Sequence, residues 1–385
     1  MPELKTMEYL KKIYKKRVNE LQELRNNGVK VIGTFCIFVP DELIFAAGAD
    51  RTILCGGKNE TIPLAEQYLP RNICPLIKSS LGSIVNDGCS GIDSCAHFGL
   101  VDMIIAENTC DGKKKMYEIL DDFIPTYVID LPQRPDTDIA LQYFLQELES
   151  LKTELELFTG NEITSTKLLD RIKESNEIRK LLHQLYCERK RDPSPISGVD
   201  VLKIMQKQFF LSPTEFKDIL KMVLEEIEHI QPEQESNTKP RVMIAGCPLS
   251  GGNTKVPKII EERGGVIVCE ESCTGTRSFW DLVDEDENKD PMLSLSQRYI
   301  NIPCSCMSPN KKRLESIVDL AQEFNVDGVI YYTLQFCHGY NIEAYNVQKE
   351  LKKAGIPMLS IETDYSDSDI EQLGVRIDAF MEMIS

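Results

Sequence analysis

The sequence predicts an α/β protein made of two tandem parallel-sheet domains of the Rossmann or flavodoxin type, with a helical segment between them. In both outer parts of the chain, short β-rich runs alternate with helical or loop segments, which is typical of a mainly parallel sheet with crossover helices. The middle of the chain contains long amphipathic stretches and few strand signals. A length of 385 residues is sufficient for more than one hydrophobic core.

The first domain is predicted over residues 1–137. It is expected to begin with a helix whose solvent-exposed face carries a basic cluster, formed by Lys11, Lys12, Lys15, Lys16 and Arg17. The β-rich runs of this domain, which are its expected strands, cover residues 29–33, 43–47, 51–54, 101–106 and 126–130.

The helical segment is predicted over residues 138–231, where leucines recur at helical spacing, as at Leu145, Leu148 and Leu151. A polar stretch with two prolines, residues 232–240, is predicted to be a linker. The second α/β domain is predicted over residues 240–385. Its expected strands cover residues 241–245, 265–269, 327–332 and 357–362.

The two α/β domains resemble each other in sequence. Val101-Asp-Met-Ile-Ile leads to Cys110-Asp-Gly, and Val326-Asp-Gly-Val-Ile leads to Cys337-His-Gly. In open α/β sheets, the loops at the carboxyl ends of the strands form the ligand-binding crevice. Each domain is therefore expected to present cysteines to such a crevice, and two facing crevices would enclose one site.

The composition excludes two classes of partner. A formal net charge of -17 argues against nucleic acid, because phosphate backbones are bound by basic faces. No stretch reaches the roughly 18 apolar residues of a membrane span, and the first ten residues lack the apolar core of a signal peptide. We expect a cytoplasmic protein with no membrane partner, in which thiols stay reduced and a disulfide framework does not form.

Six of the thirteen cysteines form two similar sets of three at expected strand-to-loop junctions. Each of the six lies beside a turn signal such as Cys-Pro or Cys-x-Gly, where a metal can reach it. The chain has only four histidines, so few ligands are available for zinc centres that mix cysteine and histidine. Ligation by thiolates alone suits iron–sulfur clusters. The first hypothesis is an iron–sulfur site held by both halves, with the candidate ligands Cys36, Cys74, Cys110, Cys247, Cys304 and Cys337.

The remaining cysteines are predicted to lie outside this site. Cys187 and Cys269 are expected to be small buried hydrophobic residues. Cys55, Cys89, Cys95 and Cys273 are also left out. The short spacings Cys89-x5-Cys95 and Cys269-x3-Cys273 could form metal-binding turns, but neither has a matching second pair.

The glycine pair of Gly251-Gly252-Asn253-Thr254 suggests a phosphate-binding loop only superficially. This stretch lacks the Gly-Lys-Ser/Thr ending that grips phosphate and magnesium. Any ATP dependence must therefore come from a partner.

The motifs around the cysteines resemble the 2-hydroxyacyl-CoA dehydratase and benzoyl-CoA reductase family. The similar segments are Gly33-Thr-Phe-Cys36 with the run to Gly48, Leu69-Pro-Arg-Asn-Ile-Cys74-Pro, Glu107-Asn-Thr-Cys110-Asp-Gly, Glu271-x-x-Thr-Gly275 and Leu-Gln-Phe-Cys337. The likeness covers nearly the full chain. It implies two tandem α/β domains and a helical part that hold a [4Fe-4S] cubane, with Cys74, Cys110 and Cys337 at the ligand positions.

Additional cysteines make the chain similar to one branch of this family, the double-cubane cluster proteins. They are Cys247 in Gly-Cys-Pro-Leu-Ser-Gly and Cys304 and Cys306 in Ile-Pro-Cys-Ser-Cys, together with Cys337-His-Gly-Tyr-Asn. This resemblance implies two cubanes joined by one sulfide, an [8Fe-9S] cluster with six thiolate ligands, which matches the six candidates in number. Either Cys304 or Cys306 binds, and the ligand sets of the two cubanes can mix the halves.

The same resemblance implies a low-potential electron-transfer reductase for small molecules. Electrons would come from a separate ATP-hydrolysing iron–sulfur activator, and the protein would form a homodimer. His338 and Tyr340 are the candidate proton donors, since they flank Cys337 and histidine titrates near neutrality. Two alternatives stay open: a dehydratase subunit with a single [4Fe-4S] cluster, and an electron-storage protein without a substrate.

Overall fold

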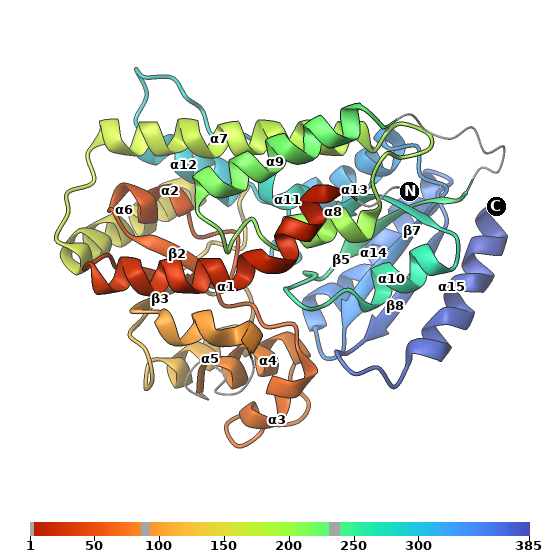
Figure 1. Ribbon diagram of the computed structural model, residues 1–385, viewed down its shortest axis with the longest axis horizontal. Helices are drawn as coiled ribbons and strands as arrows, with labels where there is room; N and C mark the ends of the chain where they lie inside the picture. The colour runs from red at the N-terminus through yellow and green to blue at the C-terminus, as the bar shows by residue number, and fades with distance from the viewer. Residues whose placement is uncertain (1–3, 86–92, 231–238) are drawn as a thin grey trace.

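The computed structural model describes residues 4–85, 93–230 and 239–385. Within these residues it contains two four-stranded parallel sheets, one in each half of the chain (Figure 1). The first sheet has the order β2-β1-β3-β4 and the second the order β6-β5-β7-β8, so the halves repeat one topology and confirm the predicted fold class. The strands are β1 (Val31–Thr34), β2 (Asp50–Ile53), β3 (Met103–Glu107), β4 (Thr126–Ile129), β5 (Arg241–Gly246), β6 (Val266–Glu271), β7 (Gly328–Leu334) and β8 (Met358–Thr363).

Helices cover the sheets in both halves. Those of the first half are α1 (Lys5–Asn26), α2 (Asp41–Ala46), α3 (Ile62–Ala65), α4 (Pro75–Val85) and α5 (Asp111–Leu120), with the short 3-10 helices η1 (Asn59–Thr61) and η2 (Asp93–Leu100). Those of the second half are α10 (Lys255–Glu262), α11 (Thr276–Phe279), α12 (Pro291–Ile300), α13 (Lys311–Glu323), α14 (His338–Lys353) and α15 (Ile370–Ile384). The central strands of each sheet are buried throughout, which explains their nearly continuous apolar sequences.

Four helices lie between the two halves in sequence: α6 (Asp138–Thr159), α7 (Ser165–Glu188), α8 (Gly198–Met205) and α9 (Pro213–Glu228). Each begins at a serine or threonine whose side chain accepts a hydrogen bond from a first-turn backbone N–H, which fixes the helix start. In Figure 1, α7 and α9 lie along one edge of both halves. Helix α6 contacts α12 and α2, and α7 contacts α2, α11 and α12, so the helical segment joins the two halves.

One predicted strand is wrong. The run 43–47 is the helix α2 and its C-cap, not a strand. Pro40 precedes the helix, and Asp41 and Glu42 stand in its first turn, where acidic side chains favour the helix dipole. The following residues are apolar without a gap and mostly buried, and such a short run does not distinguish a strand from a buried helix by periodicity.

The predicted basic face of α1 is confirmed for its four lysines, which are exposed, and is wrong for Arg17. Arg17 is fully buried, and its guanidinium donates to Asp50 Oδ1 at 2.5 Å and to the Phe210 carbonyl oxygen at 2.9 Å. This arginine therefore attaches α1 to the start of β2 and to the loop before α9. Its position on the inner face of the helix, four residues after the buried Ile13, explains why it differs from its lysine neighbours.

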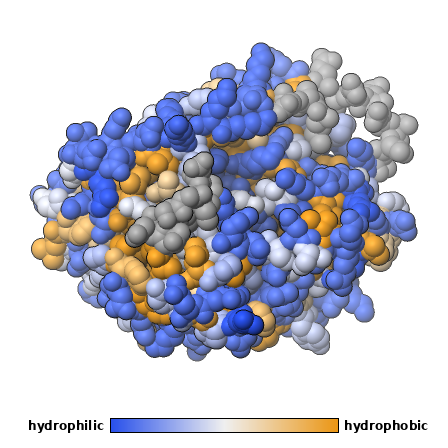
Figure 2. Space-filling model, turned by 60° about the horizontal axis from the view of Figure 1, so that its bottom comes forward, coloured by the Kyte–Doolittle hydropathy of each residue, from blue (hydrophilic) through white to orange (hydrophobic). Residues whose placement is uncertain are grey.

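Hydrophilic residues predominate on the face of the molecule shown in Figure 2, with hydrophobic residues gathered in separate patches. No helix in the described parts of the chain is both long enough and apolar enough to cross a bilayer. Residues 232–238, which are most of the predicted linker, lie outside the described residues.

Candidate functional site

Cysteines follow the carboxyl ends of three strands in each sheet. Strands β1 and β3 are neighbours, as are β5 and β7, although each pair is not consecutive in the chain. Such a reversal of strand order is the place where open α/β sheets bind ligands. The cysteines just beyond the strands are Cys36 after β1, Cys55 after β2 and Cys110 after β3, and then Cys247 after β5, Cys273 after β6 and Cys337 after β7.

The repeat extends to a fourth position in each half. Cys74 directly precedes α4, the helix between β2 and β3, and Cys304 lies in the loop before α13, the helix between β6 and β7. Each half therefore supplies four cysteines at topologically equivalent places, and Cys306 is an additional one. The internal symmetry is more complete than the two sets of three that the sequence predicts.

All these cysteines line one cavity of about 560 Å³ between the two halves. It contains the seven cysteines predicted as cofactor-binding residues, together with two that sequence reasoning left out, Cys55 and Cys273. The signal for both was their place directly after the second strand of each sheet, in Ile53-Leu-Cys55-Gly and Glu271-Ser-Cys273-Thr. Short paired spacings do not reveal them, because the partners of these cysteines come from other loops.

Three of the cavity cysteines stand at helix N-termini: Cys74 before α4, Cys110 as the N-cap of α5 and Cys337 as the N-cap of α14. First-turn backbone N–H groups of each helix act to lower the pKa of the adjacent thiol. The positive end of a helix dipole stabilises a thiolate, and thiolates are the form that binds metal. These positions suit cysteines that act as ligands.

The cysteine thiols form two groups through contacts between the halves. In the first group, Cys337 lies in hydrogen-bonding contact with both Cys247 and Cys74. These contacts lower the pKa of Cys337 well below its usual value, because the neighbouring thiols donate to its sulfur. Burial and the charge of Cys337 raise the pKa of Cys247. Cys110, the exposed cysteine at the cavity rim, also interacts with Cys337.

The second group contains two pairs, Cys36 with Cys273 and Cys304 with Cys306. Hydrogen bonding from Cys36 lowers the pKa of Cys273, and the nearby charge of Arg277 acts in the same direction. Hydrogen bonding from Cys306 lowers the pKa of Cys304 in the same way. The sequence predicts one set of three cysteines in each half. The contacts in the structure divide the cysteines differently, since each group contains cysteines from both halves.

The set of side chains at the cavity fits a thiolate-bound cluster. Sulfur is a soft ligand that favours iron–sulfur clusters, and the cavity has nine sulfur donors. In the described part of the chain, no three histidine, cysteine or acidic side chains surround a point suited to a single metal ion. The nine cysteines line one cavity of about 560 Å³.

The two candidate proton donors also line the cavity, in different surroundings. His338 is exposed at the start of α14. Tyr340 is buried, and its hydroxyl lies 3.7 Å from Cys304 Sγ and accepts a hydrogen bond from Arg277. Burial raises the pKa of Tyr340 well above its usual value, so its hydroxyl keeps its proton.

A buried ion pair also borders the cavity. Lys113, on α5, pairs with Glu107 at the end of β3, and Glu107 is fully buried. Lys113 lines the cavity, and its positive charge acts to lower the pKa values of Cys36, Cys55 and Cys110. The family motif that begins at Glu107 continues through Lys113, but sequence reasoning did not predict that these two residues form an ion pair.

Two other cysteines lie outside the cavity. Cys269 is buried, as predicted, but Cys187 is exposed, so its predicted burial is wrong. The buried face of α7 passes through Leu182, Leu185 and Tyr186, which leaves the next residue facing solvent. Cys89 and the side chain of Cys95 lie outside the described residues.

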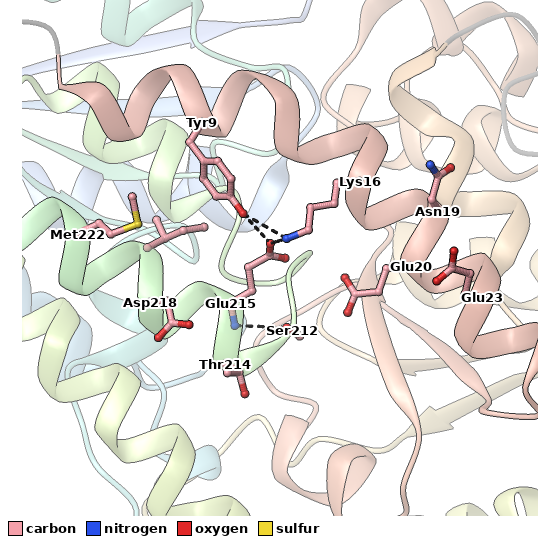
Figure 3. A pocket seen from close by; sticks show the side chains of 11 residues that line it. Tyr9, Lys16, Asn19, Glu20, Glu23, Ser212, Thr214, Glu215, Asp218 and Met222 are labelled. Carbon is pink, nitrogen blue, oxygen red and sulfur yellow. Dashed lines mark hydrogen bonds and ion pairs between the residues drawn. The ribbon is translucent and has the colours of Figure 1, made fainter.

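A second cavity, of about 630 Å³, lies between α1 and α9 (Figure 3). Glu215 Oε1 accepts a hydrogen bond from Lys16 Nζ at 2.5 Å and another from Tyr9 Oη at 3.0 Å. Three more acidic residues also line this cavity: Glu20, Glu23 and Asp218 (Figure 3). The cavity holds no cysteine, so the thiol-lined cavity is the candidate site.

Comparison with known proteins agrees with this choice. A family model described as 2-hydroxyglutaryl-CoA dehydratase, D-component, matches residues 36–384, a range that includes every cysteine of the cavity. The chain is 37% identical over 367 residues, 94% of both chains, to a protein of Escherichia coli (strain K12) named "Putative dehydratase subunit YjiM". It is 25% identical to the (R)-phenyllactyl-CoA dehydratase beta subunit of Clostridium sporogenes, over 94% of both chains. It is 24% identical to a benzoyl-CoA reductase subunit of Thauera aromatica, over 92% of this chain and 91% of that one.

Proposed function

This chain belongs to the 2-hydroxyglutaryl-CoA dehydratase D-component family, and we propose that it is an iron–sulfur reductase with a double-cubane [8Fe-9S] cluster in the cysteine-lined cavity. Relatives in this family are named as subunits of dehydratases and of a reductase. The observation that carries the proposal is the convergence of nine cysteines from both halves on one cavity. A single cubane uses four thiolates at most, so the donor set exceeds what one cubane needs.

We propose three thiolates for each cubane. Cys74, Cys110 and Cys337 are assigned to the first, which is supported by their shared position at helix N-termini and by the contact between Cys74 and Cys337. Cys36 and Cys304 belong to the second. Its third ligand is Cys247, as the sequence suggests, or Cys273, which contacts Cys36; Cys306 is the alternative to its neighbour Cys304.

When bound, such a cluster supplies low-potential electrons for the reduction of a small molecule. The chain itself excludes water from four of the nine sulfurs, because Cys74, Cys247, Cys273 and Cys304 are buried. Tyr340 holds a hydroxyl proton beside Cys304. His338, at the exposed rim, is the proposed proton donor at the cavity mouth.

The proposed partners are an ATP-hydrolysing iron–sulfur activator and a second copy of this chain. We predict that the isolated chain does not hydrolyse ATP, because Gly252 and Asn253 stand where a phosphate-binding loop that starts at Gly246 has lysine and serine or threonine. Phosphate release is measured with the purified chain alone, and then with an activator added. Sustained release by the chain alone, in preparations free of other ATPases, would contradict this prediction.

The second candidate function is that of a dehydratase subunit with one [4Fe-4S] cluster. It is favoured by the dehydratase names of two of the relatives, one of them 37% identical. This alternative requires a different second subunit and a cavity that admits a CoA thioester.

Iron analysis tests the proposal against this alternative. Protein purified without oxygen is expected to contain about eight irons per chain, because two cubanes carry four each. The measurement is iron and acid-labile sulfide per chain, with an electron paramagnetic resonance spectrum of the reduced protein. A reproducible value near four irons, with the spectrum of an isolated cubane, would assign the chain to the dehydratase alternative.

A further inference from the structure

Two adjacent carboxylates on β6 form buried ion pairs on opposite faces of the sheet. Glu270 pairs with Arg189, at 2.6 Å between Oε1 and Nη2, on the face covered by α7. Glu271 points the other way and pairs with Arg277, at 2.8 Å between Oε1 and Nε. All four side chains are at most 2% exposed. The two pairs are chemically alike, but only the second contacts a cysteine of the cavity, through Arg277 and Cys273.

Arg277 contacts the second thiol group directly. Its Nη1 lies 3.8 Å from Cys273 Sγ and donates to the hydroxyl of Tyr340, which in turn lies 3.7 Å from Cys304 Sγ. Its Nη2 donates to the carbonyl oxygens of Glu271 and of Gly246, the residue before Cys247. The guanidinium is therefore fixed on several sides and presents a positive charge to two sulfurs.

The surroundings of Arg277 hold its charge in place. Arg313 pairs with the second oxygen of Glu271 at 2.9 Å and also with Glu343. Two carboxylates and two guanidiniums thus balance in one network, in which Arg277 is the guanidinium that contacts a sulfur. A buried charge acts more strongly than a solvated one, because little water screens it.

The first thiol group has different neighbours. Cys74 and Cys247 lie near the buried phenols of Tyr332 and Tyr365, which are uncharged because burial raises their pKa values well above the usual range. Lys113 acts on Cys110 of this group, but it is paired with Glu107 and acts on Cys36 and Cys273 of the second group as well. The two ends of the cavity are therefore electrostatically unequal.

We propose that Arg277 is a positioning residue that gives the two cubanes unequal reduction potentials. Its charge and its N–H groups stabilise added negative charge on the cubane held by Cys36 and Cys304, so this cubane accepts the electron first. Reduction potentials of iron–sulfur clusters rise with hydrogen bonds to the sulfurs and with nearby positive charge. The inference rests on the proposed function, since it requires two cubanes.

The test is a redox titration of the intact, anaerobically purified protein, followed by electron paramagnetic resonance. Arg277→Gln is expected to lower the potential of the more easily reduced cubane. At fixed ambient potential its ratio of reduced to oxidised form should fall about tenfold, which corresponds to 59 mV for a one-electron couple. Glu271→Gln should shift the same potential upward, because it removes the balancing negative charge. Arg277→Lys keeps the charge and should shift it less than the glutamine variant.

The matched control is Glu270→Gln. This residue stands next to Glu271 on the same strand and loses an equally buried ion pair, but on the opposite face, so both potentials should stay unchanged. If the loss of a buried ion pair acted only by destabilising the fold, Glu270→Gln and Glu271→Gln would change the potentials alike. Opposite shifts in Arg277→Gln and Glu271→Gln, with no shift in Glu270→Gln, identify an electrostatic effect.

Three outcomes overturn the inference. The first is an Arg277→Gln protein with full iron content and unchanged potentials. The second is an equal shift of both cubanes, which would deny any asymmetry. The third applies if Arg277→Gln does not retain iron. It is a Glu271→Gln protein whose reduction potentials equal those of the wild type. Failure of the proposed function is seen separately, since wild-type protein with only four irons would reveal it before any variant is made.

Discussion

Replacing Cys337 by serine is expected to remove most of the iron from the anaerobically purified protein. Cys337 contacts both Cys74 and Cys247 and caps α14, so it stands at the centre of the first thiol group. A serine hydroxyl is a hard ligand that replaces a soft thiolate poorly. Iron and sulfide analysis, together with the reduced spectrum, measures the loss.

The position of each cysteine predicts how much iron is lost. Cys304→Ser is expected to remove the second cubane and to leave a spectrum of a conventional [4Fe-4S] cluster, with about half of the iron. Cys247→Ser and Cys273→Ser distinguish the third ligand of the second cubane, since only the ligand variant should show the same loss. These variants show whether a cysteine that contacts another cysteine in the protein without a cluster also binds iron.

Cys187→Ser is the control. Cys187 is exposed on α7, outside the cavity, so its replacement should leave iron content unchanged and alter the free energy of unfolding by no more than about 0.5 kcal/mol. Full iron content in Cys337→Ser would contradict the ligand assignment. Full double-cubane spectra in both members of either pair of alternatives, Cys247→Ser with Cys273→Ser or Cys304→Ser with Cys306→Ser, would contradict the proposed ligands of the second cubane.

Much of the fold could be predicted from the sequence, because the buried strands keep continuous apolar runs. Eight of the nine predicted runs overlap observed strands, and the exception, 43–47, is a short buried helix of the kind that composition does not distinguish from a strand. Burial of Arg17 could not be predicted either. It depends on Asp50 and Phe210, which approach α1 only in the folded chain.

The candidate site shows the same division. The sequence located seven of the cavity cysteines through turn signals and family resemblance. It did not locate Cys55 and Cys273, whose neighbours belong to other loops or to the other half. Nor could it identify Arg277 as a neighbour of the sulfurs, since its contacts with Tyr340 and Gly246 span 63 and 31 positions of the chain.

Loss of the ion pair between Glu42 and Arg179 should destabilise the whole protein. Glu42, on α2, accepts hydrogen bonds at 2.7 Å from Arg179 on α7 and at 2.7 Å from Tyr299 on α12. The three side chains thus connect the first half, the helical segment and the second half. Arg179→Met leaves the buried carboxylate without its cation, which costs about 3–5 kcal/mol.

Denaturant unfolding under anaerobic conditions measures this cost. Arg171→Met is the matched control, because Arg171 is on the same helix, is 45% exposed and pairs with Glu174 on the surface. Exposed pairs of this kind contribute at most about 1 kcal/mol. Equal destabilisation by the two substitutions would show that the buried pair does not join the halves.

The pH dependence of unfolding provides a second measure of the same pair. Burial alone would raise the pKa of Glu42, but Arg179 and Tyr299 outweigh it and lower the pKa below its ordinary value of 4.5. A carboxylate with a lowered pKa stabilises the folded state fully above its unfolded-state pKa of about 4.3, and this contribution is lost as the pH falls through the folded-state value. The difference in unfolding free energy between wild type and Glu42→Gln should therefore be constant near neutrality and shrink below about pH 4. A difference that grows on acidification would mean that Glu42 is protonated in the native protein, and the proposed ion pair would be wrong.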